Sequence, residues 1–591
     1  MNVNPYAAMM SSFSESNYST INASLRISQE LDFITKGLSA TVLVNMKSHS
    51  SSSYTNTLSP YFYKVMDYTW DPSDPEFFYL ELLQKGTDYI KQGTINRYSD
   101  RTFYFDARVN YNRRFGEDHT VSGMLMYMQR EYRSDVLPQR NQGLSGRFTY
   151  DYQNKYFAEF NFGYNGTERL ASGHRFEFFP AMSLGWAVSN ESFWEPLSTA
   201  VTHFKIRGSY GLVGSDETGL LAGAAHFLYI NNVNIDGSGI FSTGPYDGVY
   251  ISKKGPGIEG YAVENASWER AKKFDIGVDL NLFDQVSITF DYFHDRRDRI
   301  LQKRGSWPVI MGYAHATPWS NIGKVDNKGF ELSVNWKKEI IKDMFVDLRG
   351  NFTYTQNKYV YNDEPDYPYV WQTKTGKPLS CTYGYIADGL FEDEDDIRNS
   401  PSQKNLGSTV MPGDIKYRDV NGDGAITTED QVMLSRYGGI PRIQYGFGLN
   451  WTYKNIDFGV FFNGSAQRTL MIDNIAPFCS DVGNQDRNLM KFIADNYWSE
   501  ASPNPEAAYP RLGVNNSQVA NNMKPSSFWM RNGNFLRFKT LELGYSFSFC
   551  RIYLSGDNLA VWSPFKLWDP ELSYSAYPLQ RAINIGAQFT F

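Results

Sequence analysis

The segment RAINIGAQFTF (581–591) alternates strictly between apolar and small or polar side chains. One face of the expected strand carries Ile583, Ile585, Ala587, Phe589 and Phe591. The other face carries Ala582, Asn584, Gly586, Gln588 and Thr590. A β-strand rises about 3.3 Å per residue and alternates faces, so this segment is long enough to cross a bilayer as one stave of a barrel. The same period also suits a half-buried strand of a soluble sandwich, and this stretch alone leaves both interpretations open.

The composition narrows the class of protein. A chain of 591 residues exceeds the usual limit of about 250 to 300 residues for one hydrophobic core, which predicts several domains or one large closed architecture. Aromatic residues make up 16% of the chain, and the net charge is -7 with no basic stripe, so nucleic-acid binding is not expected. No window has 18 consecutive apolar residues, and the first residues lack the pattern of a secretory signal. The three cysteines, Cys381, Cys479 and Cys550, are too scattered to indicate a disulfide framework or a zinc site.

Segments with a period of two recur along the whole chain, and no helical pattern competes with them. The clearest expected strands lie at 101–113, 156–165, 274–282, 344–354 and 443–453. About 17 such strands are predicted, with boundaries less certain than their existence. The segment 214–269 is Gly-rich and shows no alternation, so it is expected to be an irregular insertion.

The connections between these strands indicate how the strands are arranged. Tight turns at 116–118, 153–155, 284–285 and 454–455 alternate with longer loops. Only the link at 190–202 is longer than its place in this alternation predicts. In an up-and-down antiparallel barrel every second connection lies on the same rim, so this parity places the turns on one side and the loops on the other. The pattern therefore predicts an all-β, transmembrane antiparallel up-and-down β-barrel with long extracellular loops.

The polar faces of the expected strands support the same prediction. They carry Asp, Arg, Glu and Asn on nearly every strand, and unpaired charges cannot line a dry core. They can line an aqueous or plugged lumen while the apolar faces meet outer-membrane lipid.

The sharpest local motif is DVNGDGAITTED (419–430), which has the spacing of a calcium-binding loop. Its predicted ligands are Asp419, Asn421, Asp423, the carbonyl of Ala425, Thr427 and Asp430. Asp430 stands where a bidentate Glu is usual, and its shorter side chain favours weak binding. The alternative is an Asp/Asn/Gly turn cluster that folds without metal. If Ca²⁺ binds, it is expected to act as a structural ion that stabilises a long loop, and no other cofactor is expected.

No catalytic constellation accompanies this motif, so the chain is not expected to be an enzyme. The acidic run at 392–396 is interpreted as a solvated face. Trp371, Tyr383, Tyr385 and Trp529 could stack on sugar rings or peptide side chains, but packing between loops is the favoured interpretation.

Several longer runs together resemble one family. They are LPQRNQGLSGRFTYDYQNKYFAEFNFGYNGTERLASGHRFEFFPAMSLGWAVSNESFW (137–194), PGDIKYRDVNGDGAITTEDQ (412–431), GIPRIQYGFGLNWTYKNIDFGVFFNGS (439–465), FLRFKTLELGYSF and IYLSGDNLAVWS, with the terminal Phe591. They are similar to the SusC/RagA-type TonB-linked outer-membrane proteins (TonB-dependent receptors) of Bacteroidota. The resemblance implies a barrel of about 22 strands filled by a plug and located in the cell outer membrane. It also implies a SusD-like surface lipoprotein as partner and import of oligosaccharides or peptides with energy relayed by the TonB complex.

The chain departs from the family pattern at its front. The signal peptide, the amino-terminal extension, the TonB-contacting segment and the plug have no counterpart, and about five strands of the family barrel are missing. Residues 1–591 are therefore predicted to be a partial TonB-dependent receptor β-barrel domain, an incomplete arc from a truncated, split or mispredicted reading frame. Residues 357–441 are predicted to form a long extracellular loop that contains the 419–430 motif. Because an open arc leaves unpaired strand edges, transport by these residues alone is not expected.

The leading functional hypothesis is therefore the barrel portion of a TonB-dependent nutrient receptor that admits substrate through its lumen. The alternative from another class is a secreted soluble glycan-binding β protein with a dockerin-like calcium loop. A passive porin is a third hypothesis.

Overall fold

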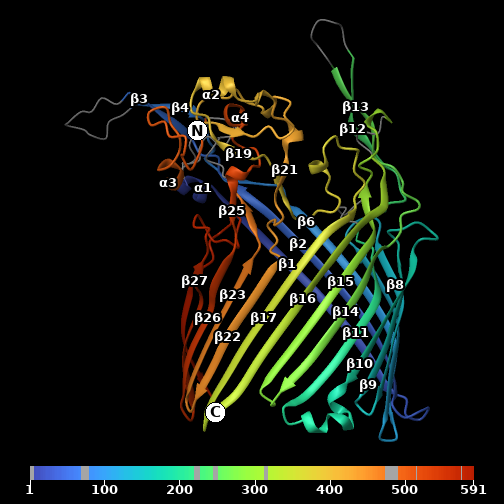
Figure 1. Cartoon of the computed structure of the whole chain (residues 1–591). Helices are drawn as coiled ribbons and strands as arrows, with labels where there is room; N and C mark the ends of the chain where they lie inside the picture. The colour runs from blue at the N-terminus through green and yellow to red at the C-terminus, as the bar shows by residue number, and fades with distance from the viewer. Residues whose placement is uncertain are drawn as a thin grey trace. The chain divides into compact units, whose positions relative to one another are not determined.

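The computed structural model describes residues 5–67, 79–217, 227–243, 251–311, 317–472, 490–513, 516–573 and 576–590 (Figure 1). Its main element is a sheet of 18 strands, which includes the two-residue strand β5 (Lys91–Gln92). The prediction of an all-β protein with about 17 antiparallel strands is thus confirmed. The chain divides into two compact units, which are described separately.

The smaller unit comprises Met1–Ile34, Ser39–Val109 and Met126–Gly143. Its elements are α1 (Pro5–Ser11), β1 (Ser12–Glu30), β2 (Leu38–Thr57), β3 (Phe62–Asp67), β4 (Tyr79–Gln84) and β5. Strands β1 and β2 pair antiparallel from Ser12 opposite Thr57 to Glu30 opposite Ser39, and every residue of β1 is exposed. Strands β6 (Asn96–Phe115), β7 (His119–Arg133) and β8 (Gln139–Tyr152) each have residues in both units.

The larger unit comprises Thr35–Leu38, Asn110–Leu125 and Leu144–Phe591 and contains a continuous antiparallel ladder. Each strand pairs with the next strand of this order: β9 (Tyr156–Thr167), β10 (Phe176–Ala187), β11 (Val201–Ser215), β14 (Glu269–Leu282), β15 (Val286–Lys303), β16 (Trp319–Ile341), β17 (Met344–Tyr361), β22 (Ile443–Tyr453), β23 (Ile456–Ala466), β26 (Phe535–Ser546), β27 (Cys550–Trp562) and β28 (Ala582–Phe589). The strand predicted at 581–591 is therefore present as β28, and Phe591 lies outside the described residues.

The connections of the larger unit alternate as predicted. Tight turns join β8 to β9, β14 to β15, β16 to β17, β22 to β23 and β26 to β27, and in Figure 1 the labelled strands run from these turns up to the long connections. Several turn residues, including Asn154 and Lys454, have φ values near +53° and +52°, the left-handed conformation that two-residue hairpin turns require. The exceptional link after β10 contains two short 3₁₀ helices, η1 (Val188–Asn190) and η2 (Ser192–Leu197), which explains its length.

The two faces of the ladder differ as the sequence predicted. The apolar face is exposed, with Leu184 at 55% and Phe447 at 46% of full exposure. Rings on neighbouring strands stack along this face, for example Phe447 on Phe462 at 5.2 Å between ring centroids. The opposite face carries charged groups in pairs, so the ladder has one face suited to lipid and one suited to water.

The prediction that 214–269 is wholly irregular is wrong. Strand β11 continues to Ser215, and β12 (Asn232–Thr243) pairs with β13 (Ile251–Gly260) as a hairpin. Register shifts at Gly237 to Gly239 interrupt the alternation of the hairpin, which is why its period is hidden in the sequence.

The connection after β27 contains no helix or strand among the described residues, whereas the connections after β17 and β23 contain short elements of their own. These are η5 (Val370–Gln372), β18 (Thr382–Gly384), β19 (Ala387–Leu390), α2 (Glu394–Asn399), η6 (Lys404–Leu406), β20 (Ile415–Tyr417), η7 (Thr428–Asp430), β21 (Val432–Ser435), β24 (Thr469–Met471), α3 (Lys491–Ala494), α4 (Asn516–Val519), η9 (Ser527–Trp529) and β25 (Met530–Asn532); η4 (Val309–Met311) lies between β15 and β16. Among the described residues no helix has the length and apolar character needed to cross a membrane. Cys381 and Cys550 are free thiols, and Cys479 lies outside the described residues.

These three connections share one buried cluster, which we call the loop core. It consists of Tyr385, Leu390, Leu406, Ile415, Tyr417, Ile426, Ile472, Ile493, Trp498, Ala507, Tyr509, Trp529 and Phe565. The loop core therefore holds segments from distant parts of the sequence in one folded body beside the strand ends.

Candidate functional site

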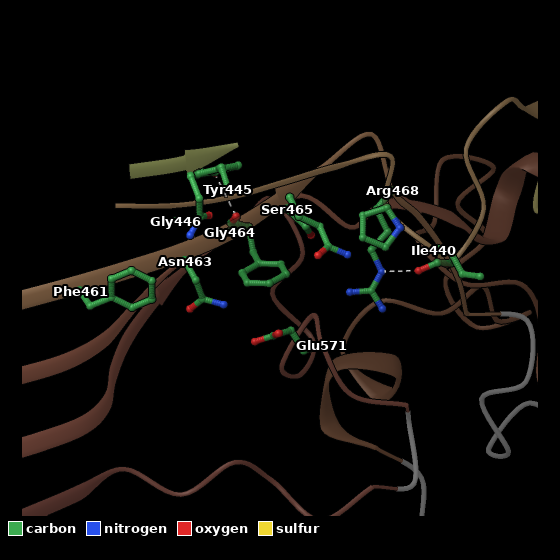
Figure 2. Close-up of a pocket in the computed structure, with 14 residues that line it drawn as sticks. Ile440, Tyr445, Gly446, Phe461, Asn463, Gly464, Ser465, Arg468 and Glu571 are labelled. Carbon is green, nitrogen blue, oxygen red and sulfur yellow. Dashed lines mark hydrogen bonds between the residues drawn. The ribbon is translucent and has the colours of Figure 1, made fainter. Parts of the chain in front are cut away.

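A cavity of about 500 Å³ lies on the polar face of β17, β22 and β23, where these strands meet the long connections (Figure 2). Its lining consists of Asn351, Gly439, Ile440, Pro441, Gln444, Tyr445, Gly446, Phe461, Asn463, Gly464, Ser465, Arg468, Phe535 and Glu571. Strand residues form one side of this cavity and residues of the long connections form the other.

Two side-chain oxygens in the lining have no hydrogen-bond partner within the protein. They are Oδ1 of Asn463 and Oγ of Ser465, and Ser465 is only 5% exposed. A buried polar atom without a partner is costly, and it indicates a site that a water molecule or a ligand would complete. These two oxygens make the cavity a candidate binding site.

Charged groups lie at the loop side of the cavity. Arg468 donates from Nε to the carbonyl of Gly439 at 2.8 Å and from Nη1 to the carbonyl of Pro570 at 2.6 Å. Burial lowers the pKa of Arg468, against the opposing influence of the nearby carboxylates Glu571 and Asp569. Glu571 accepts from Nε of the buried Arg537 at 2.7 Å. The charged groups of Arg468 and Glu571 are therefore both held in place by other protein groups.

Aromatic rings and glycines shape the remaining lining. Tyr445 donates its hydroxyl to the carbonyl of Phe535 at 3.2 Å, which fixes the ring at the cavity edge. A Cβ atom at Gly464 would lie 2.5 Å from that carbonyl and 2.6 Å from the Tyr445 ring, so only glycine fits there. The cavity combines amide, hydroxyl and charged groups with apolar ring faces, an arrangement that can bind a polar organic solute. Neither His nor Cys is present in the lining to activate Ser465 as a nucleophile.

None of these lining residues was predicted from the sequence to bind a ligand. Asn463 and Ser465 follow the clear alternation of β23, and the only available signal was their place on the polar face of the last residues before a long connection. That signal is weak because many strands end in this way.

The comparisons with known proteins agree with this architecture. The family model described as "TonB dependent receptor-like, beta-barrel" matches residues 4–559. The chain belongs to this family. It is an all-β outer-membrane protein, and the hypothesis of a soluble secreted protein is wrong.

Individual relatives share low sequence identity with this chain. This receptor-like barrel is 26% identical over 468 residues to TonB-dependent receptor P3 of Formosa agariphila, covering 75% of this chain and 43% of that protein. It is 23% identical over 574 residues to TonB-dependent receptor SusC of Bacteroides thetaiotaomicron, covering 92% of this chain and 53% of SusC. The structure of the RagAB peptide importer in its closed-closed state matches with a TM-score of 0.70 at 18% identity, covering 99% of this chain and 63% of that chain. The chain therefore spans about half the length of the curated relatives that it matches.

The predicted calcium loop of this receptor-like barrel is ordered by its own hydrogen bonds. Asp430 is fully buried and accepts from the backbone N–H groups of Val420 at 2.8 Å and Thr427 at 2.8 Å. Asp419 accepts from the N–H groups of Gly422 at 2.6 Å and Gly424 at 2.8 Å.

The remaining predicted side-chain ligands of this loop also accept hydrogen bonds from backbone N–H groups. Asn421 Oδ1 accepts from Asp423 N, Asp423 Oδ1 accepts from Ala425 N, and Thr427 Oγ1 accepts from Glu429 N. Among the described residues no three His, Cys, Asp or Glu side chains are grouped to hold a metal. This geometry is compatible with the turn-cluster alternative, and calcium binding stays a prediction.

The motif nevertheless anchors the loop core. Ile426, at the eighth position of the motif, is fully buried in it, and its N–H donates to the carbonyl of Ser402 at 2.8 Å. Trp371 donates from Nε1 to the carbonyl of Glu429 at 2.7 Å. The motif therefore joins two segments of the connection between β17 and β22.

The other singled-out residues also have structural surroundings. Tyr385 and Trp529 are buried in the loop core, as the packing interpretation predicted, while Trp371 and Tyr383 are half-buried. The acidic run at 392–396 begins α2, where the Asp393 side chain accepts from Asp396 N at 2.8 Å as an N-cap.

A buried ion pair crosses the loop core. Asp414 is fully buried and lies 2.6 Å from Nε of Arg511, and it also accepts from Nδ2 of Asn522 at 2.8 Å. Burial raises the pKa of Asp414, although Arg511 and Asn522 oppose that rise. Asp414 therefore ties the connection after β17 to the connection after β23.

A second polar cavity of about 540 Å³ lies on the polar face of β8 to β11. There Arg207 lies 3.2 Å from Asp279 and 2.7 Å from Asp291. None of the described residues that line this cavity has a buried side-chain nitrogen or oxygen without a hydrogen-bond partner, so it is a weaker candidate for a ligand site than the cavity with the unpaired oxygens.

Proposed function

We propose that this chain is the barrel portion of an outer-membrane receptor that imports a nutrient, an oligosaccharide or a peptide, with energy supplied through TonB. Family membership supports the receptor assignment, and the cavity with the unpaired Asn463 and Ser465 oxygens supports binding of a polar organic solute. The cavity would contact the substrate at the loop end of the strands before the substrate passes along the polar face. No catalytic step is needed for this role.

The proposed partner at the loop end is a SusD-like surface lipoprotein. Two relatives support this: one is named SusC, and one solved structure is the RagAB peptide importer. The loop core offers a folded body on which such a partner could close, because its segments are held by a buried cluster and the Asp414–Arg511 pair.

Uptake by the receptor in its native host tests this proposal. Labelled oligosaccharides and oligopeptides would be supplied to cells with the wild-type chain or with Asn463→Leu. Loss of one hydrogen bond at the cavity should reduce the uptake of the true substrate about three- to tenfold. The matched control is Asn450→Leu, the same change on the polar face of neighbouring strand β22 outside the cavity lining.

Energy dependence separates active import from the passive porin hypothesis. Uptake should be abolished when TonB is depleted. Uptake that survives TonB depletion would identify a porin, and unchanged uptake in Asn463→Leu at equal outer-membrane abundance would remove the cavity from the proposal.

A further inference from the structure

A shallow apolar groove of about 560 Å³ lies on the exposed, apolar face of β9, β10 and β11, opposite the polar cavity of the same strands. The lining residues on this face include Tyr156, Ala158, Leu184, Trp186, Gly208 and Ile276. The groove lies wholly in the larger unit.

The strand register explains why a groove forms here. Leu184 lies opposite Ala158 on one side and Gly208 on the other, so two very small residues flank it in one row across the sheet. The next row towards the turn contains Tyr156 and Trp186, whose rings stack with an interplanar angle of 9°. The small residues therefore leave a dip beside the wall that the Tyr156 and Trp186 rings form.

The space beside Gly208 is open. A Cβ atom built at Gly208 would meet only the carbonyl of Asp275, at an ordinary contact distance of 3.7 Å. A larger residue would fit this backbone, so the glycine is not required by a close approach. The open space is therefore a property of the apolar surface.

Polar groups close the groove at the turn end. The hydroxyl of Tyr156 donates to Glu191 at 2.6 Å, and Nε1 of Trp186 donates to the same carboxylate at 3.2 Å. Lys155 lies 3.3 Å from Glu191. One cationic and one anionic group therefore stand side by side, about 10 Å along the strand from Ala158.

This position corresponds to a membrane interface. The short turns of outer-membrane barrels face the periplasm, and rings such as Tyr156 and Trp186 mark the boundary between headgroups and acyl chains. The groove lies just inside this boundary, on the face that meets lipid, and the charge pair lies at headgroup depth.

We propose that the groove binds one acyl chain of a zwitterionic phospholipid of the inner leaflet, with its headgroup beside Lys155 and Glu191. A headgroup with a phosphate and an ammonium matches the two charges, the phosphate next to Lys155 and the ammonium next to Glu191. The rigid aromatic wall and the dip beside Leu184 provide close packing that a flat lipid-facing strand surface lacks. A second protein chain would need a contact of at least about 1,000 Å², far more than these few side chains present.

Native mass spectrometry of the chain extracted from outer membranes tests the proposal. The probes are phosphatidylethanolamine and phosphatidylglycerol with identical acyl chains. The wild-type chain should retain phosphatidylethanolamine in preference, and Gly208→Leu should reduce retention about fivefold because the added side chain fills the groove. Ala158→Phe fills the groove from the other side of Leu184 and serves if Gly208→Leu fails to fold, which loss of heat-modifiable gel mobility would show.

Two further variants make the test specific. Glu191→Gln leaves Lys155 without its anionic neighbour, so the preference should shift towards the anionic phosphatidylglycerol. Ile585→Phe adds bulk to the apolar face of β28, where Ile585 is 82% exposed, and should retain lipid as the wild type does. Equal retention in Gly208→Leu, equal loss in Ile585→Phe, or a dimer in place of a lipid adduct would each overturn the proposal. None of these outcomes depends on which nutrient the receptor imports.

Discussion

The strand ladder and the loop core of the larger unit are stabilised in opposite ways. The ladder is held by backbone hydrogen bonds between strands that follow one another in the ladder. Its large apolar side chains remain exposed, as Ile585 and Leu184 show. The loop core buries its apolar side chains completely, as for Ile426 and Trp529, and joins segments more than 100 residues apart. The first suits a hydrocarbon environment and the second an aqueous one.

This difference predicts that mutations in the loop core will destabilise the long connections without unfolding the strands. Two readouts on the protein in detergent therefore separate the two regions. Hydrogen exchange or limited proteolysis reports on the loop core, and heat-modifiable gel mobility reports on the ladder.

The largest effect is expected for Asp414→Ala. It leaves Arg511 buried without its carboxylate, and breaking a buried pair in this way costs about 3–5 kcal/mol. The loop core should become open to protease at 362–442, 490–513 and 516–534, and the gel mobility of the ladder should not change. Because Asp388 and Arg418 are both partly exposed and solvent screens their attraction, Asp388→Ala should destabilise the loop core far less. Equal sensitivity of the two variants would show that the Asp414 pair does not hold the loops together.

Ile426→Ala should have the next largest effect. Removal of a fully buried Ile side chain typically costs about 2–5 kcal/mol through lost burial and a residual cavity. Hydrogen exchange should rise in the loop core and not in the strands. Val370→Ala is the matched control, because Val370 is 87% exposed in the same connection. A uniform rise in exchange over strands and loops would contradict the separation between the two regions.

Much of the ladder could be predicted from sequence, because its information is local. Each strand repeats one alternation, and residues such as Asn154 and Lys454 at tight turns leave the alternation of connections visible. The hairpin of β12 and β13 could not be predicted, since bulges at its glycines break the period.

The candidate site could not be predicted for a different reason. Its lining combines Asn351 and Asn463 from the strands with Arg468 and Glu571 from two separate connections. Only the tertiary packing of those connections brings these residues together, and no spacing in the sequence records that packing. The calcium motif was visible because its proposed ligands lie within twelve consecutive positions, 419–430.

A smaller effect is expected in the ladder from Lys454→Gly. Lys454 has a φ of +52°, a left-handed conformation that costs a residue other than glycine about 1–2 kcal/mol. Glycine relieves this strain but gives the unfolded chain more conformational entropy, which offsets about 0.4–1 kcal/mol, so the turn should be stabilised by at most about 1 kcal/mol. The temperature at which heating converts the folded gel band into the unfolded band should rise slightly. Hydrogen exchange in the loop core should stay constant. Lys337→Gly, in the interior of β16, is the control and should destabilise. A loss of stability in both variants would show that turn strain is not what limits the ladder.

The smallest effect is expected for the removal of calcium from 419–430. It tests whether this loop is stabilised by an ion or by hydrogen bonds alone. Weak extracellular-type sites have dissociation constants near 1 mM, so 1 mM calcium would stabilise the loop core by about 0.4 kcal/mol. We expect a chelator to raise loop-core exchange by this small amount and to leave the ladder unchanged. Asp423→Asn keeps an oxygen that can accept from Ala425 N but removes a charge, so it should abolish the calcium response without changing exchange in chelator. Asp395→Asn, in the exposed acidic run, should keep the full response. If wild type and Asp423→Asn respond alike, the hydrogen bonds of Asp419 and Asp430 to backbone N–H groups are sufficient, and the motif is a turn cluster that needs no metal.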